Sequence, residues 1–98
     1  MDKILSLVGL ARRAGKAVSG EFSTEKAVKE GKASLVLIAS DASANTKKLF
    51  GDKCSYYGVP LREYADKKAL GGALGQEERA SLAVTDSGFA QAVLKILD

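Results

Sequence analysis

Residues 35–39 form an unbroken apolar run, Leu-Val-Leu-Ile-Ala, in a chain of 98 residues. A continuous apolar run with β-branched members is typical of a strand that is covered on both faces, because a half-exposed strand alternates apolar and polar side chains. The run is far too short to span a bilayer, so it belongs to a folded core. We therefore expect a central strand whose sheet is covered by other elements on both sides.

Helical and strand-like patterns alternate along the rest of the chain. Apolar side chains recur at helical spacing in residues 2–14, which predicts a helix ending near Gly15. We further expect helices over residues 22–31, from the capping segment 40–43 through about Tyr56, from Asp66 to near Gly75, and from Asp86 or Ser87 through Leu97, with strands over residues 61–64 and 81–85. This order predicts one domain over residues 1–98, an α/β/α sandwich with a small sheet. In such sheets, ligands favour the loops at one end of the strands.

The helix start from Gly20 to Lys26 follows a short apolar step at residues 17–18. A helix start presents unpaired N–H groups and a partial positive charge, and glycine at its entry lets a large partner approach the backbone. Ser23 and Lys26 are three residues apart and therefore share a face of the first turn. Backbone donors, a hydroxyl and a cation suit a phosphate or the edge of a base. The alternative is an ordinary surface helix start, a common feature.

The positive charge of the chain is concentrated around that segment. Residues 1–34 carry seven cationic and four acidic side chains, whereas residues 35–98 carry eight of each, so the formal excess of +3 lies in the first third. An uneven charge of this kind favours an anionic partner. The excess is mild, and solvated lysines on an exposed face would also account for it.

Several chemistries are excluded by composition. The chain has no histidine, which removes Ser-His-Asp and Cys-His arrangements and nearly every zinc site. Its single cysteine, Cys54, allows no disulfide within the chain; we expect it in the core and the protein in a reducing cytoplasm. Nothing indicates a carboxylate pair, since Glu77 and Glu78 fall in a loop where both are solvated. We expect no catalytic residue, metal or cofactor.

Residues 9–16, Gly-Leu-Ala-Arg-Arg-Ala-Gly-Lys, superficially resemble a phosphate-binding P-loop. Five residues separate the glycines instead of four, Ala17 replaces the magnesium-binding Ser or Thr, and a helix precedes the segment where a strand is needed. The segment is better interpreted as a helix C-terminus with a basic end. Gly71 and Gly72 form no nucleotide-binding fingerprint either, and they permit close packing or the close approach of a partner.

The aromatic content of 6%, without tryptophan, argues against a stacking platform for single-stranded nucleic acid. Recognition of a structured RNA by helix ends and loops fits the chain better.

Five segments in order make the chain similar to a known superfamily. They are the Gly-Leu-Ala-Arg-Arg-Ala-Gly-Lys stretch at 9–16, the helix start at 20–26, Leu-Val-Leu-Ile-Ala-Ser-Asp-Ala-Ser-Ala-Asn-Thr at 35–46, the Lys-Lys-Ala-Leu-Gly segment at 67–71 through Gly75, and Ala-Val-Thr-Asp-Ser-Gly-Phe-Ala at 83–90. Over nearly its whole length the chain resembles the kink-turn-binding ribosomal protein superfamily (archaeal large-subunit ribosomal protein type), especially its small bacterial YlxQ-like branch. The resemblance implies an α/β/α sandwich with a four-stranded mixed sheet.

The resemblance also implies two RNA-contacting segments. The helix start enters the widened groove at tandem sheared G·A pairs, which places Gly20, Ser23 and Lys26 there. The loop 76–81 packs against an extruded nucleotide and is supported from behind by Asp41 and nearby Lys47. The residues expected at the RNA are Gly20, Glu21, Phe22, Ser23, Lys26, Lys29, Arg79, Ala80 and Ser81.

The sequence departs from the superfamily pattern at Phe22, where Asn, Lys or Gln is usual. Phe22 either stacks on a base or fixes the helix to the core, and of the two we expect the core role. Glu21 and Glu25 add negative charge to the helix start, as Glu77 and Glu78 do to the loop.

The leading hypothesis is a non-catalytic, cytoplasmic and monomeric RNA-binding protein with no membrane association. Its partner would be a kink-turn or ribosomal RNA linked to ribosome or translation function. The alternative, motivated by the acids in both segments, is a protein-interaction module of the ribosome or transcription machinery that has lost specific RNA binding. A small nucleotide-using enzyme is a distant third.

Overall fold

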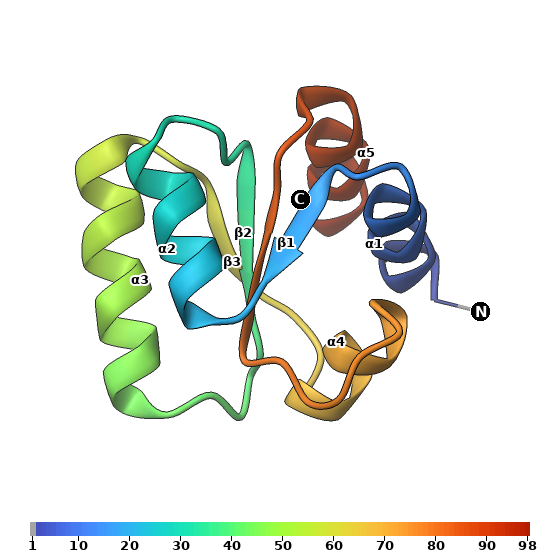
Figure 1. Cartoon of the computed structure of the whole chain (residues 1–98), viewed down its shortest axis with the longest axis horizontal. Helices are drawn as coiled ribbons and strands as arrows, with labels where there is room; N and C mark the ends of the chain where they lie inside the picture. Colours follow the sequence, from blue (N-terminus) through green and yellow to red (C-terminus); the bar gives the residue numbers. More distant parts are fainter. Residues whose placement is uncertain (1) are drawn as a thin grey trace.

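A four-stranded mixed sheet divides the molecule into two helical layers (Figure 1). The computed structural model describes residues 2–98. The strand order is β1-β4-β2-β3. Helices α2 (Glu21–Lys29) and α3 (Ala44–Tyr57) cover one face, and α1 (Lys3–Arg13), α4 (Lys67–Ala73) and α5 (Ser87–Leu97) cover the other. The predicted α/β/α sandwich is therefore confirmed.

The predicted central strand is β2 (Leu35–Ile38), all of whose residues are buried. It pairs in parallel with β3 (Leu61–Glu63) and antiparallel with β4 (Ser81–Val84), which is also buried throughout. The edge strand β1 (Ala17–Ser19) pairs antiparallel with β4. The pattern of residues 17–18 indicated only an apolar step. Three residues are too few for a pattern to identify a strand, and β1 exists because β4 offers it a partner.

The helix boundaries follow the predicted capping residues. Asp66 and Asp86 accept hydrogen bonds from the backbone N–H groups of Ala69 and Phe89, as an N-cap side chain does. Ser43 caps α3 in the same way. None of the helices within residues 2–98 is long and apolar enough to cross a membrane.

The segment that superficially resembles a P-loop is the C-terminal end of α1, as predicted. The helix ends at Arg13, with two arginines in its last turn. Gly15 follows with a φ of +73°, a left-handed conformation that favours glycine.

Cys54 belongs to the core, as predicted. Its side chain is buried in the same hydrophobic core cluster as Phe50 and Val28. Burial raises the pKa of its thiol to about 11. A thiol with such a raised pKa is a poor nucleophile at neutral pH.

Candidate nucleic-acid interface

The two segments singled out in the sequence meet at one end of the sheet. The antiparallel pairing of β1 with β4 places the end of β1, which leads into α2, beside the start of β4, which follows the loop 75–80. The N–H group of Gly20 donates to the carbonyl of Ser81 at 3.0 Å. Residues 20–26 and 76–80 therefore form one continuous surface, called here the helix–loop surface.

Gly20 occupies a conformation that other residues avoid. Its φ of +90° and ψ of +159° lie where glycine is strongly favoured, and it holds the N-cap position of α2. Within residues 2–98 no side chain caps this helix start. The first N–H groups of α2 lack intrahelical acceptors, so they remain available to an anionic or carbonyl-bearing partner.

Ser23 and Lys26 share a face of α2, as predicted. They line a shallow hollow of about 270 Å³ together with Val18 and Phe22. Lys26 is exposed and makes no ion pair with another described residue. Lys29 lies one turn further on and forms an ion pair with Glu25 at 3.1 Å, which reduces its attraction for an outside anion.

The expected core role of Phe22 is wrong. Its side chain is 78% exposed, whereas the buried stripe of α2 consists of Thr24, Ala27 and Val28. Phe22 therefore projects an aromatic ring into solvent at the helix–loop surface. An exposed ring of this size contributes little to the fold, which leaves it free to contact a partner.

Arg79 joins the loop to the rest of the surface. Its guanidinium donates to the Ser19 hydroxyl at 3.1 Å, to the Glu78 carbonyl at 3.0 Å and to the Gln76 side-chain oxygen at 3.3 Å. Three acceptors on one planar group hold the loop in a defined conformation. Arg79 is half-buried and acts mainly within the protein, although it was expected to contact RNA.

Ser81 does not contact solvent. It is 1% exposed, and its hydroxyl lies 3.4 Å from the hydroxyl of Thr24, which is also buried. The prediction of Ser81 as a contact residue is therefore wrong. Its carbonyl and hydroxyl instead fix the start of α2 against β4. Ala80, the residue before it, is partly exposed.

The loop is supported from behind by α4. The Arg79 N–H donates to the Lys67 carbonyl at 3.0 Å, and the Lys67 N–H donates to the Asp41 carboxylate at 2.8 Å. Asp41 thus has the expected supporting role, exerted through Lys67. The same role for Lys47 is wrong, because its ammonium group bonds the Ser40 carbonyl at 2.8 Å and Glu63 at 3.3 Å.

Three of the four acids noted in the sequence remain exposed and outside any ion pair among residues 2–98. These are Glu21, Glu77 and Glu78. Only Glu25 has a cationic partner, Lys29. The helix–loop surface is therefore mixed in charge rather than uniformly basic.

Sequence patterns did not identify Ser19 or Thr24, which position the surface through Arg79 and Ser81. These contacts link residues about sixty positions apart, so no local signal could reveal them.

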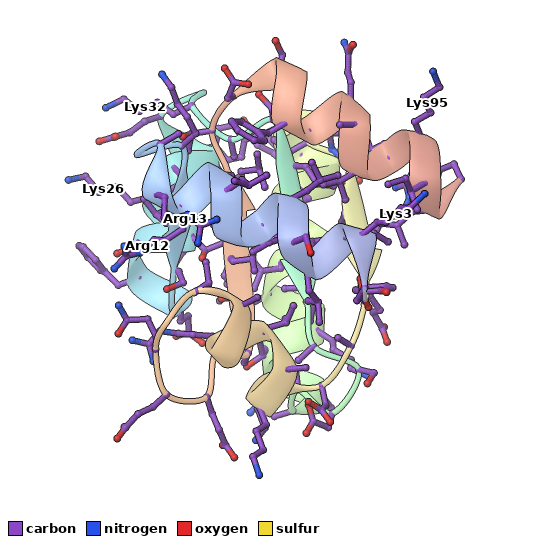
Figure 2. All side chains as sticks on the ribbon, turned by 90° about the vertical axis from the view of Figure 1, so that its right-hand side faces the viewer. Lys3, Arg12, Arg13, Lys26, Lys32 and Lys95 are labelled. Carbon is purple, nitrogen blue, oxygen red and sulfur yellow. The ribbon has the colours of Figure 1, made fainter. Side chains whose placement is uncertain are left out.

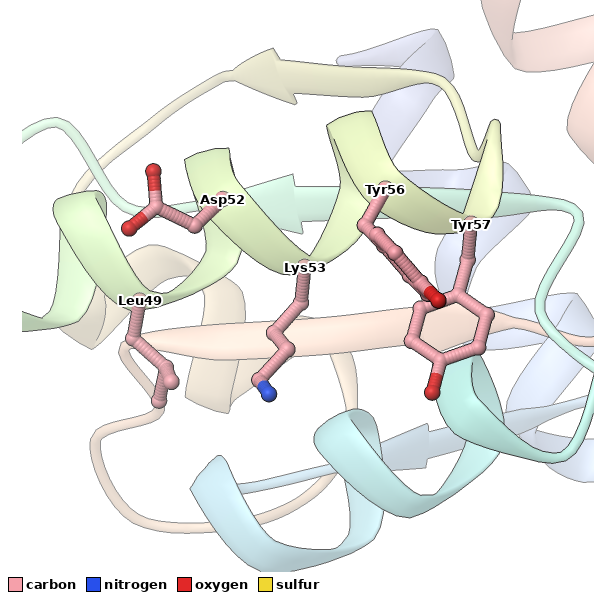
Figure 3. A pocket seen from close by; sticks show the side chains of 5 residues that line it. All are labelled: Leu49, Asp52, Lys53, Tyr56 and Tyr57. Atoms are coloured by element: carbon pink, nitrogen blue, oxygen red, sulfur yellow. The ribbon is translucent and has the colours of Figure 1, made fainter.

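Another hollow, of about 520 Å³, lies on α3 (Figure 3). It is lined by Leu49, Asp52, Lys53, Tyr56 and Tyr57. The two tyrosine rings meet edge to face, with their centroids 4.9 Å apart. Tyr56 is 81% exposed.

Replacement of Arg79 by alanine should loosen the helix–loop surface. We expect the free energy of unfolding to fall by about 1.5 kcal/mol, because the variant loses hydrogen bonds from a charged donor. Urea denaturation measures this loss, and amide exchange at Gly20 should accelerate as the loop separates from β1. Arg79→Lys should recover only part of the stability, since an ammonium group cannot span the three acceptors. Unchanged exchange at Gly20 in Arg79→Ala would contradict the bridging role.

Comparisons with known proteins add an independent line of evidence. The model of the ribosomal protein L7Ae/L30e/S12e/Gadd45 family matches residues 2–94. RNA-binding protein YlxQ of Bacillus subtilis (strain 168) is 47% identical over 92 residues, covering 94% of this chain and 92% of that protein. RNA-binding protein YlxQ of Enterococcus faecium is 38% identical over 97 residues, covering 99% and 93%.

Two solved structures share the fold. A protein with unknown function from Bacillus halodurans superposes with a TM-score of 0.96 at 40% identity, covering 100% of this chain and 99% of that one. The 15.5kD RNA binding protein of Giardia lamblia superposes with a TM-score of 0.83 at 25% identity, covering 99% of this chain and 87% of that one.

Proposed function

The chain belongs to the ribosomal protein L7Ae/L30e/S12e/Gadd45 family, and from this premise we propose that it is a non-catalytic RNA-binding protein. Its ligand is a kink-turn-like structured RNA, in ribosomal RNA or another RNA of the translation machinery, and it works in the cytoplasm. The names of the relatives from Bacillus subtilis and Enterococcus faecium, both RNA-binding proteins, support the RNA partner.

The observation that carries the proposal is the junction of the two segments through Gly20 and Ser81. A kinked RNA presents a widened groove and an extruded nucleotide close together, so its recognition requires two adjoining protein elements. The helix–loop surface supplies both, because the uncapped start of α2 adjoins the loop 76–80. A helix start can enter a groove that a broad flat surface cannot.

Each exposed group of the surface has a distinct role in this proposal. The open N–H groups at the start of α2 and the Ser23 hydroxyl bond base edges or phosphate oxygens. Lys26 pairs with a phosphate. Lys29 attracts phosphate groups more weakly, because it also forms an ion pair with Glu25. The Glu21 carboxylate accepts from a base amino group, as carboxylates do in base recognition. Phe22 stacks on a base, and Ala80 offers an apolar contact in the loop.

Titration with a kink-turn RNA, and with the same RNA carrying Watson–Crick pairs in place of its tandem G·A pairs, tests the proposal. We expect wild-type protein to bind the kinked RNA at least tenfold more tightly. Lys26→Ala should weaken binding and reduce the slope of log affinity against log salt concentration by about one unit, because one phosphate contact is lost.

Lys95→Ala provides the matched control. Lys95 is an exposed lysine on the far edge of the molecule, and its removal changes net charge equally (Figure 2). Equal affinity of wild-type protein for the two RNAs would reduce the interaction to non-specific attraction.

A second candidate function is protein binding, and the exposed tyrosine pair on α3 favours it. Tyrosine is enriched at protein interfaces. The carboxylates of Glu77 and Glu78, which form no ion pair with another described residue, repel the phosphates of an RNA strand. This candidate requires that partners remain bound in a pull-down after nuclease treatment and that Tyr56→Ser releases them. Loss of all partners on nuclease treatment would leave RNA binding as the function.

A further inference from the structure

A groove of about 380 Å³ lies where the C-terminal ends of α1 and α4 meet. Its lining consists of Gly9, Arg12, Arg13 and residues 72–75. We call it the arginine groove. None of its lining residues was among those expected at the RNA, and no acidic side chain lines it.

The guanidinium N–H groups of both arginines in the groove have no side-chain partner among the described residues. Arg12 and Arg13 are exposed, and neither takes part in a hydrogen bond or an ion pair with another described side chain. Figure 2 shows them on α1, toward the same edge of the molecule as Lys26 and Lys32 and away from Lys3 and Lys95. Their positive charges interact favourably with the negative end of the α1 dipole, but this interaction does not use the N–H donors of the guanidinium groups. A planar fork of this kind matches the geometry of a phosphate group.

Gly72 in the groove has no steric reason to be glycine. It lies inside α4 with ordinary helical geometry, and an added Cβ would meet nothing within 4 Å among the described residues. Glycine weakens a helix relative to alanine, so the fold gains nothing from it. The neighbouring Gly71 differs, because a Cβ there would collide with the Glu77 backbone. Because Gly72 has no side chain and lies beside Arg12 and Arg13, the backbone of another molecule can approach closely there.

The groove adjoins the helix–loop surface along the chain at Gly75. Gly75 lines the groove and begins the loop whose next residues, Gln76 to Ala80, belong to that surface. A ligand that occupies the surface and continues past Gly75 therefore enters the groove.

We infer that the arginine groove binds the phosphodiester backbone of an RNA helix flanking the nucleotides held at the helix–loop surface. The inference rests on the proposed function and extends it to a second contact. Arg12 and Arg13 pair with phosphate oxygens, and Gly72 lets the strand approach the end of α4. The contact carries no base readout, because phosphate groups are the same in every sequence. It raises affinity and fixes the direction in which the flanking helix leaves the protein.

The test compares two kink-turn RNAs, one with a flanking helix long enough to pass the groove and one cut back to the kink. Arg12→Gln/Arg13→Gln should bind the long RNA about tenfold more weakly and reduce its salt slope by about two units. On the short RNA the double variant should match wild-type protein. Glutamine keeps the helix propensity of these exposed positions, so the variant should fold, with only the small loss of stability that follows from removing two cations at the end of α1.

Two further variants sharpen the test. Gly72→Gln fills the groove without changing the charge, and it should also weaken binding of the long RNA alone while thermal unfolding stays at or above the wild-type temperature. Lys3→Gln/Lys95→Gln removes the same charge from the far edge and should leave both affinities close to those of wild-type protein.

The possible failures are distinguishable. If Lys26→Ala weakens binding while the double arginine variant binds the long RNA as wild-type protein does, the groove inference is overturned and the proposed function stands. An equal loss in the Lys3→Gln/Lys95→Gln control also overturns the inference, since the effect is then diffuse charge. If wild-type protein binds neither RNA, both are overturned.

Discussion

Alanine in place of Gly71 is expected to lower the free energy of unfolding by about 3 kcal/mol, at the upper end of the cost of overpacking. The added Cβ would lie 1.8 Å from the carbonyl oxygen of Glu77 and 2.6 Å from its carbonyl carbon. Both atoms are backbone, so no side-chain rotation relieves the collision. Gly71 also accepts a hydrogen bond from the Gln76 N–H at 2.8 Å, which holds the loop against α4.

Urea denaturation measures the loss, and Gly72→Ala is the control. At position 72 the added Cβ meets nothing within 4 Å of the described residues, and alanine should raise stability by up to about 1 kcal/mol because it favours the helix. The two substitutions are chemically identical and differ only in what the methyl group meets. A similar effect of both would show that helix propensity, and not the contact with Glu77, determines the result.

The glycine pair illustrates what sequence patterns can and cannot establish. The sequence indicated that adjacent glycines permit close packing or a partner's approach. The structure assigns close packing to Gly71, whose neighbour is the loop backbone. Only the three-dimensional position of residue 77 distinguishes the two glycines, and no local pattern contains it.

Most of the fold could be predicted because its signals are local. The apolar run at residues 35–39 identified β2, and the capping side chains of Asp66 and Asp86 located two helix starts. The strand β1 could not be predicted, since its three residues are held by pairing with β4. The same pairing brings Gly20 to Ser81. The start of α2 and the loop 76–80 therefore lie side by side only because β1 and β4 are neighbours in the sheet.

The error at Phe22 was avoidable from helical geometry. With about 100° between successive residues, position 22 lies about 140° from Ala27 and about 120° from Val28 around the axis. Apart from Phe22, Ala27 and Val28 are the apolar residues of this helix, and both are buried. Phe22 therefore had to point away from the core. Ser81 could not be judged in this way, because only the sheet order reveals that β4 is central and its first residue buried.

Phe22→Ala is expected to weaken binding of a kink-turn RNA by about tenfold to a hundredfold, since stacking of a base on an aromatic ring contributes about 1–3 kcal/mol. The fold should be unaffected to within about 0.5 kcal/mol, because the side chain is 78% exposed. Titration of the folded variant therefore reports on binding alone. Tyr56→Ala is the matched control: it removes an equally exposed ring, 81% accessible, from α3, outside the helix–loop surface, and RNA affinity should remain that of wild-type protein.

An RNA with an abasic site at the extruded nucleotide separates stacking from a general apolar contribution. If Phe22 stacks on that base, the abasic RNA and Phe22→Ala each remove the same interaction, so combining them should cost little more than either alone. Losses that simply add would mean that the ring contacts something other than the extruded base. Full affinity of Phe22→Ala for intact RNA would remove the ring from the interface, and the start of α2 would then have to bind through Ser23, Lys26 and its open N–H groups alone.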